Sequence, residues 1–270
     1  MRTCFNTATS GQYPLKDTIE YLGRYRYEGI EIDDARLQEY LAERSVDDLR
    51  QQLARNRVEV AALMAFPFKA FGERAQIVAN VGKHAEMAKA LGAPVLLYFA
   101  ADQPPEGMSR EEALERAAAS AAEYGDGAAP FEVKIALEPI GGLRFMGGPK
   151  DALAIAAKSG RPNVGIMMDT FHYFKSNIPL EEIRAIPVEK LLIVHINDSP
   201  DLPRGELNDS HRVYCGEGAI PLVEELRALK RMGYGGFLSV EIFNRDYWAD
   251  THENIVRKSK ETLDRVLAQV

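Results

Sequence analysis

The sequence predicts a (β/α)8 TIM barrel, formed as a single domain by residues 1–270. Eight strand-like runs alternate with amphipathic helical stretches, and no linker rich in Pro, Gly or Ser divides the chain. The length matches the roughly 250 residues typical of this barrel. A doubly wound open sheet is the alternative, but that fold usually has a glycine-rich turn after its first strand, where this chain has TATSGQYP.

Each expected strand is a short β-branched or apolar run, and strict alternation with helices requires the strands to be parallel. In order along the chain, the runs cover residues 3–9, 29–33, 58–66, 94–100, 134–140, 164–170, 191–198 and 237–243. Helices fill the intervals. Ser45 with Asp48 and Ser109 with Glu112 have the spacing of capping boxes. Helix ends are expected at Gly92, Gly160 and Gly233.

Composition narrows the class of protein. A hydrophobic fraction of 46% and a charged fraction of 27% exclude disordered and fibrous chains. The net charge of -7 argues against a nucleic acid partner. No apolar run is long enough to suggest a membrane partner, and Cys4 and Cys215 are too far apart in the sequence to indicate a thiol site. We expect a cytoplasmic protein without a disulfide, and the sequence leaves a homo-oligomer open.

Four ionisable residues stand at the carboxyl ends of consecutive expected strands. Glu138, Asp169, His195 and Glu241 lie in IALEP, IMMDT, IVHIND and LSVEIF. Alternation of side chains along a strand points all four into the barrel, at the rim where active sites form. Buried carboxylates repel one another unless a cation lies between them. The four therefore predict one divalent metal ion, Mn²⁺ or Zn²⁺ first, with Co²⁺ and Mg²⁺ also compatible. The alternative is that the acids bond to loop amides and His195 packs in the core.

At these residues the chain resembles the xylose isomerase-like TIM-barrel superfamily of sugar isomerases and epimerases. Within it, the sequence is similar to the inosose (2-keto-myo-inositol) isomerases of inositol catabolism. Their CFNxAT, KIALE, DxFH, HIxDxxDxPxGxLxDxxRVxxGxGAI and VSVExF motifs are matched by CFNTAT, KIALE, DTFH, HINDSPDLPRGELNDSHRVYCGEGAI and LSVEIF. The resemblance covers nearly the whole chain and is weakest from about Pro67 to Asp126.

The resemblance implies a metal-dependent isomerase or epimerase of a cyclic or open-chain polyhydroxy ketone. It implies that Glu138 and Glu241 are the catalytic acid/base pair, and that His172 and Arg212 contact substrate oxygens. Such a reaction removes a proton from a carbon beside a carbonyl, and a cation makes this easier by stabilising the enediolate. Asn6 is expected among the substrate contacts.

Several other residues allow two interpretations. Glu31 and Asp33 also end a strand on the inward face, and they either shape the pocket floor or belong to a buried hydrogen-bonded network. An aromatic group either walls a sugar ring or packs in the core. It consists of Phe66, Phe68, Phe71, Tyr247 and Trp248.

Other activities of the same fold remain open. A dehydratase of the inosose or 3-dehydroshikimate type would use the same metal and proton abstraction but expel a hydroxyl group. Ketose 3-epimerase and hydroxypyruvate isomerase activities fit comparably, and a non-catalytic sugar-binding barrel is a further class. An apurinic-site endonuclease shares DTFH and CGEG but needs additional histidines. No histidine precedes His84, and Arg212 stands four residues before Gly216, where those nucleases have one.

Overall fold

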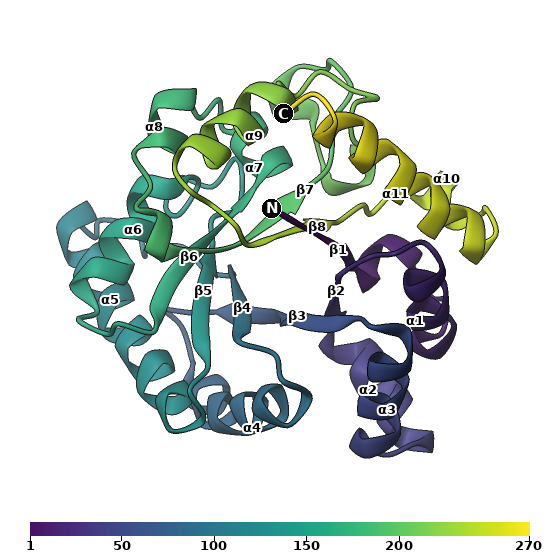
Figure 1. Ribbon diagram of the computed structural model, residues 1–270. Coiled ribbons are helices and arrows are strands. Elements are labelled where there is room, and N and C mark those ends of the chain that lie inside the picture. Colours follow the sequence, from purple (N-terminus) through teal and green to yellow (C-terminus); the bar gives the residue numbers. More distant parts are fainter.

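The computed structural model describes residues 1–270 as a closed barrel of eight parallel strands surrounded by helices (Figure 1). The strands follow one another around the barrel in sequence order, and the last pairs with the first. The predicted barrel is therefore confirmed, and the open sheet is excluded. The strands are β1 (Arg2–Asn6), β2 (Gly29–Asp33), β3 (Glu59–Phe68), β4 (Val95–Ala100), β5 (Lys134–Glu138), β6 (Val164–Asp169), β7 (Leu191–Ile196) and β8 (Phe237–Val240).

The helices form the outer layer, with some short ones on the loops that follow the strands (Figure 1). They are α1 (Leu15–Arg24), α2 (Asp34–Glu43), α3 (Val46–Asn56), α4 (Ala75–Leu91), α5 (Arg110–Ala128), α6 (Pro149–Lys158), α7 (Thr170–Lys175), α8 (Leu180–Arg184), α9 (Leu222–Arg231), α10 (Arg245–Trp248) and α11 (His252–Leu267). The capping box at Ser45 is complete, whereas at Ser109 only the side chain of Ser109 accepts from the Glu112 amide. No helix is long and apolar enough to span a bilayer.

The barrel interior is packed beneath the carboxyl rim. Its side chains near the predicted metal residues are apolar: Ala136 precedes Glu138, Met167 precedes Asp169, and Ile193 precedes His195 on the same strand face. This is the alternation expected from the sequence. A larger cluster fills the space between strands and helices. The interior therefore supports the four polar side chains from below and leaves them at the open end.

The structure corrects the carboxyl ends of several expected strands. β1 ends at Asn6 because its side chain accepts from the Ala8 amide and starts a 3-10 helix, η1 (Thr7–Ser10). β7 ends at Ile196 and β8 at Val240, so Glu241 lies one residue beyond its strand. β3 continues to Phe68, two residues further than expected. Apart from β3, these strands end earlier than the apolar runs suggest, and at β1 the polar side chain of Asn6 bonds the turning backbone.

Most of the aromatic group packs in the fold rather than lining a ring site. Phe66 and Phe68 are buried, and the Phe66 ring stacks on His84 with centroids 4.1 Å apart. Phe71 lies edge-on to Phe145, and Tyr247 stacks on Tyr214. For these rings the packing interpretation is correct. Trp248 is the exception, because it lines a cavity at the rim.

Candidate metal centre

The structure brings the four predicted metal residues together in one buried cluster. Glu138 ends β5, Asp169 ends β6, His195 is the penultimate residue of β7, and Glu241 follows β8. One ligand atom from each lies within 4.8 Å of the others, and all four side chains are buried. From the Nδ1 atom of His195, the carboxylate oxygens of Glu241, Asp169 and Glu138 are 3.0, 3.6 and 3.9 Å away.

The ring of His195 is oriented by a residue from the far side of the barrel. Its Nε2 atom lies 2.8 Å from Oε2 of Glu31, which is fully buried. Its Nδ1 atom is buried and makes no hydrogen bond. A carboxylate on one ring nitrogen fixes the tautomer that presents a lone pair on the other nitrogen to a metal. Glu31 thus belongs to a buried network rather than to an open pocket floor.

Arg212 supplies positive charge to the cluster. Its Nη1 atom donates to Asp169 Oδ2 and Glu241 Oε2, each at 2.7 Å, and its Nη2 atom donates to Asp209 Oδ1 at 2.9 Å. The guanidinium group also lies 5.0 Å from the ring centre of Phe171. The side chain is buried. Because a buried charge needs partners, Arg212 is held by the same carboxylates that face the predicted metal position.

Three carboxylates lie together in the cluster, and the charged groups beside them shift the pKa values of its members. Burial raises the pKa of Glu138 well above its ordinary value. Burial also works against ionisation of Asp169, but the Arg212 guanidinium holds the pKa of that carboxyl well below its usual range. Burial disfavours the charged form of His195, yet Glu241 and Glu31 raise the pKa of its imidazole well above normal. The cluster therefore retains protons that a bound cation would replace.

The donor set fits a divalent cation. Three carboxylates and one imidazole are oxygen and nitrogen ligands of the kind that Mn²⁺ and Zn²⁺ accept. The unbonded His195 Nδ1 atom, at 3.0 Å from the nearest carboxylate oxygen, needs a partner that the protein itself does not supply. Glu138, Asp169, His195 and Glu241 are the residues that would hold the ion.

The two remaining predicted substrate contacts lie beside the cluster. His172, on α7, is buried, and its Nε2 atom lies 3.3 Å from Arg212 Nη2 and 3.8 Å from Glu138 Oε1. Burial lowers the pKa of its imidazole, which favours the neutral ring, and its Nδ1 atom has no hydrogen-bond partner. Asn6 Nδ2 donates to Glu31 Oε2 at 3.2 Å and to Glu241 Oε1 at 3.1 Å. Asn6 therefore joins the network around the cluster.

Some residues of the site were not singled out from the sequence. Asp209 pairs with Arg212 from three positions earlier, a spacing that the sequence displays. Asn197 Nδ2 donates to Asp169 Oδ1 at 3.2 Å. Asp198 accepts backbone N–H groups of Gly216, Gly218 and Ile220 at 2.9–3.0 Å and so ties down the segment that follows Arg212. Asn197 and Asp198 belong to the motif HIND and could have been selected from it, but a motif does not show which residues they bond.

The fold and the buried donor set define the class of protein: a (β/α)8 barrel whose carboxyl rim carries four side chains that could hold a divalent metal ion. Residues 19–266 match the family described as Xylose isomerase-like TIM barrel, and the chain belongs to this family.

Individual relatives show which members of the family this chain is similar to. The chain is 32% identical over 284 residues to an inosose isomerase of Bacillus velezensis, which covers 100% of this chain and 98% of that protein. A crystal structure of the IolI protein with a binding zinc atom has a TM-score of 0.93 and 31% identity, covering 100% of this chain and 99% of that one. A 3-dehydroshikimate dehydratase of Pseudomonas aeruginosa is 27% identical over 258 residues, covering 92% of this chain and 39% of that protein. These similarities identify the chain as an enzyme of the sugar isomerase and epimerase type.

Proposed function

We propose that this protein is a divalent-metal-dependent isomerase of an inosose or a related polyhydroxy ketone. One observation carries the proposal. The buried Glu138, Asp169, His195 and Glu241 lie within 4.8 Å of one another, with an unbonded imidazole nitrogen among their carboxylates. Similarity to inosose isomerase over the full length of the chain supports the substrate class.

The residues around the cluster match the needs of proton transfer beside a carbonyl. A bound divalent cation supplies positive charge that stabilises the enediolate oxygens. A carboxylate removes the proton from the hydroxyl-bearing carbon, the C–H electron pair forms the new C=C bond, and the carbonyl π pair moves to oxygen. The hydroxyl proton passes to the former carbonyl oxygen, and the former hydroxyl oxygen forms the new C=O bond. The C=C electron pair then takes the returning proton at the former carbonyl carbon, which completes the shift. Glu138 and Glu241 are the proposed proton carriers.

Arg212 and His172 are proposed to hold the substrate. Arg212 offers N–H donors in a fixed plane, which suits vicinal oxygens. His172 is neutral where burial lowers its pKa, so it can donate a hydrogen bond without adding charge. Asn6 is the third proposed contact. Because its side-chain amide already donates to Glu31 and Glu241, we propose that Asn6 contacts the substrate while it remains part of this hydrogen-bonded network.

The test follows deuterium exchange in a panel of ketones. Metal-loaded protein is incubated in D₂O with inososes, ketoses and hydroxypyruvate, and NMR records deuterium incorporation and new isomers. Incorporation together with an isomer is expected for an inosose. Glu241→Gln should keep its metal and lose exchange, while the exposed Glu217→Gln serves as the matched control. A Glu241→Gln protein with wild-type exchange would remove Glu241 from the mechanism, and no exchange across the panel would refute the proposed reaction.

A dehydratase is the second candidate, and the same experiment separates it. The observation in its favour is the 27% identity to a 3-dehydroshikimate dehydratase across 92% of this chain. Both reactions begin with removal of a proton beside a carbonyl, but the dehydratase then loses the hydroxyl group on the neighbouring carbon. Loss of water from 3-dehydroshikimate or an inosose, without an isomer, would establish the dehydratase.

The finer assignments belong to this proposal. Mn²⁺ or Zn²⁺ is the proposed ion, supported by the donor types and by the zinc atom in the IolI structure. We place the enzyme in the cytoplasm, where the two free, buried cysteines would stay reduced. The net charge of -7 supports a small-molecule partner rather than nucleic acid. Metal analysis of the purified protein and sedimentation velocity would test the ion and the proposed option of a homo-oligomer.

A further inference from the structure

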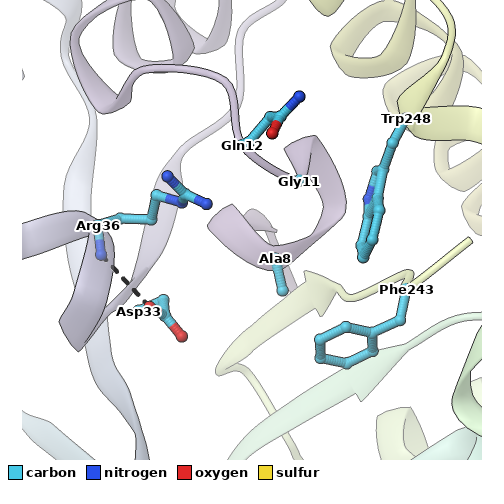
Figure 2. Close-up of a pocket in the computed structure, with 7 residues that line it drawn as sticks. All are labelled: Ala8, Gly11, Gln12, Asp33, Arg36, Phe243 and Trp248. Atoms are coloured by element: carbon cyan, nitrogen blue, oxygen red, sulfur yellow. Dashed lines mark hydrogen bonds between the residues drawn. The ribbon is translucent and has the colours of Figure 1, made fainter. Parts of the chain in front are cut away.

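A cavity with one aromatic side and one polar side opens at the rim of the barrel (Figure 2). Its volume is about 380 Å³, within the range of small-molecule sites. Phe243 and Trp248 form the aromatic side, and Asp33 and Arg36 lie across from them (Figure 2). The complete lining is Ala8, Gly11, Gln12, Asp33, Arg36, Phe243 and Trp248.

Short connections link this cavity to the metal centre. Asn6 donates to Glu241 and accepts from the backbone amide of Ala8, which lines the cavity. Phe243 follows Glu241 by two residues, and its ring centre lies 5.3 Å from the Arg212 guanidinium. One aromatic ring thus borders both the cavity and the arginine that bonds the cluster. These contacts place the cavity beside the cluster, at the same rim of the barrel.

The polar side has hydrogen-bonding capacity that the fold does not use. Oδ1 of Asp33 accepts the amides of Ala35 and Arg36 at the start of α2, and its Oδ2 atom makes no hydrogen bond. Nη1 of Arg36 donates to Glu39 at 2.5 Å, and the other two nitrogens of its guanidinium group make no hydrogen bond. The Gln12 amide also makes no hydrogen bond. Carboxylate, guanidinium and amide groups together match hydroxyls, which both donate and accept.

The aromatic side is built by close packing of Trp248 on the chain. Gly11 has a φ of +58°, and a Cβ atom placed there would lie 2.8 Å from Cγ of Trp248. Glycine therefore both permits the left-handed turn and lets the indole pack against the backbone. An indole face beside hydrogen-bonding groups is suited to a ring that has an apolar C–H face and a hydroxylated edge.

We propose that this cavity is the subsite for the edge of a cyclic polyol ring that lies opposite the reacting carbonyl carbon, which is itself a ring atom. The indole of Trp248 and the ring of Phe243 lie against the C–H face, and Asp33, Arg36 and Gln12 bind hydroxyls. This rests on the proposed function, since the ring is that of the polyhydroxy ketone. The subsite gives the enzyme a preference for cyclic ketones over three-carbon ketones, which are too short to reach it.

The fluorescence of Trp248 provides a binding assay that does not need turnover. Trp248 is the only tryptophan in the chain, so its emission reports on this cavity. The metal-loaded protein is titrated with myo-inositol, which has no carbonyl group to isomerise, and with dihydroxyacetone. A saturable change is expected with myo-inositol only. Arg36→Ala should weaken that binding at least tenfold. Arg50→Ala is the matched control, because Arg50 also pairs with an acid three positions away but lies outside the cavity.

Kinetics provide the second measurement. Trp248→Ala should raise KM for the cyclic ketone at least tenfold, and Trp248→Phe, which keeps a ring, should recover part of the loss. The ratio of kcat/KM for cyclic over three-carbon ketone should fall in the Ala variant. Turnover of an inosose with no fluorescence change and an unchanged ratio would overturn the subsite and leave the isomerase intact. Saturable myo-inositol binding that Arg36→Ala weakens, without turnover of any ketone, would uphold the polyol subsite and refute the isomerase.

Discussion

Glu225, a buried residue outside the four-residue metal cluster, leads to a prediction about how stability depends on pH. Its side chain is buried on α9 with 5% of its surface exposed, and its Oε2 atom has no hydrogen-bond partner. Burial raises the pKa of Glu225 to about 8, and Asp198 and Asp169 add to the rise. The folded protein thus keeps this carboxyl group neutral at pH 7, whereas the unfolded chain ionises it above its ordinary value of 4.5.

The sign follows from proton uptake on folding. Between pH 4.5 and about 8, folding must add a proton to Glu225, so stability falls as the pH rises through that interval. The stability that goes with a neutral Glu225 is fully present below pH 4.5 and is lost by about pH 8. Each pH unit corresponds to about 1.4 kcal/mol, and pH 7 lies about 2.5 units above the unfolded-state value. Glu225→Gln, which is neutral in both states, should therefore be more stable than the wild type by about 3 kcal/mol at pH 7.

Urea unfolding followed by circular dichroism and fluorescence would measure the difference. The stability gain of Glu225→Gln should be near zero at pH 4.5 and grow with pH up to about 8. Taking the difference between variant and wild type removes the titrations of groups that do not interact with Glu225. Glu224→Gln is the control, since Glu224 is exposed on the same helix and should change stability little at any pH. A gain for Glu225→Gln that does not change with pH would refute the burial argument.

Three further predictions concern the site. Glu31→Ala should weaken metal binding about 10–100-fold in a competition titration with a chromophoric chelator, because His195 loses its orienting carboxylate. Glu31→Gln should recover part of that loss, and the exposed Glu43→Gln should not differ from wild type. Removing the metal with a chelator should lower Tm by about 5–10 °C in a calorimetric scan, reversed by added Mn²⁺ or Zn²⁺; no shift would favour a non-catalytic barrel. Asp198→Ala should cost about 3 kcal/mol in chemical unfolding, since four backbone N–H groups lose their acceptor, while the exposed Asp201→Ala should be near neutral.

The sequence was sufficient for the barrel and for the convergence of the four cluster residues. Parallel strands of period two place residues at strand ends on one rim, so Glu138 and Asp169 could be brought together by counting alone. The error at β8 did not matter, because Glu241 continues the same alternation one residue past the strand. The fold and the cluster both follow from the regular alternation of side chains along parallel strands, which the sequence pattern shows directly.

Pairings across the barrel could not be predicted in the same way. Glu31 lies 164 positions from His195 in the sequence, and only closure of the barrel brings their side chains to 2.8 Å. The position of Arg212 depends on an irregular loop held by Asp198, so its ion pairs with Asp169 and Glu241 follow from loop geometry. The cavity likewise combines segments after β1, β2 and β8, and no single motif contains it.

Several polar strand-end residues perform two tasks, and this determines which variants are informative. Asn6 starts η1, Asp33 caps α2, and Asp169 caps α7 through the amides of Phe171 and His172. Replacing any of them with Ala would remove a cap worth about 0.5–2 kcal/mol together with any chemical role, so lost activity would be ambiguous. Asp169→Asn keeps an acceptor for the cap while it removes the negative charge. Glu138 and Glu241 cap no helix, so their substitution by Gln tests proton transfer with the least disturbance of the rim.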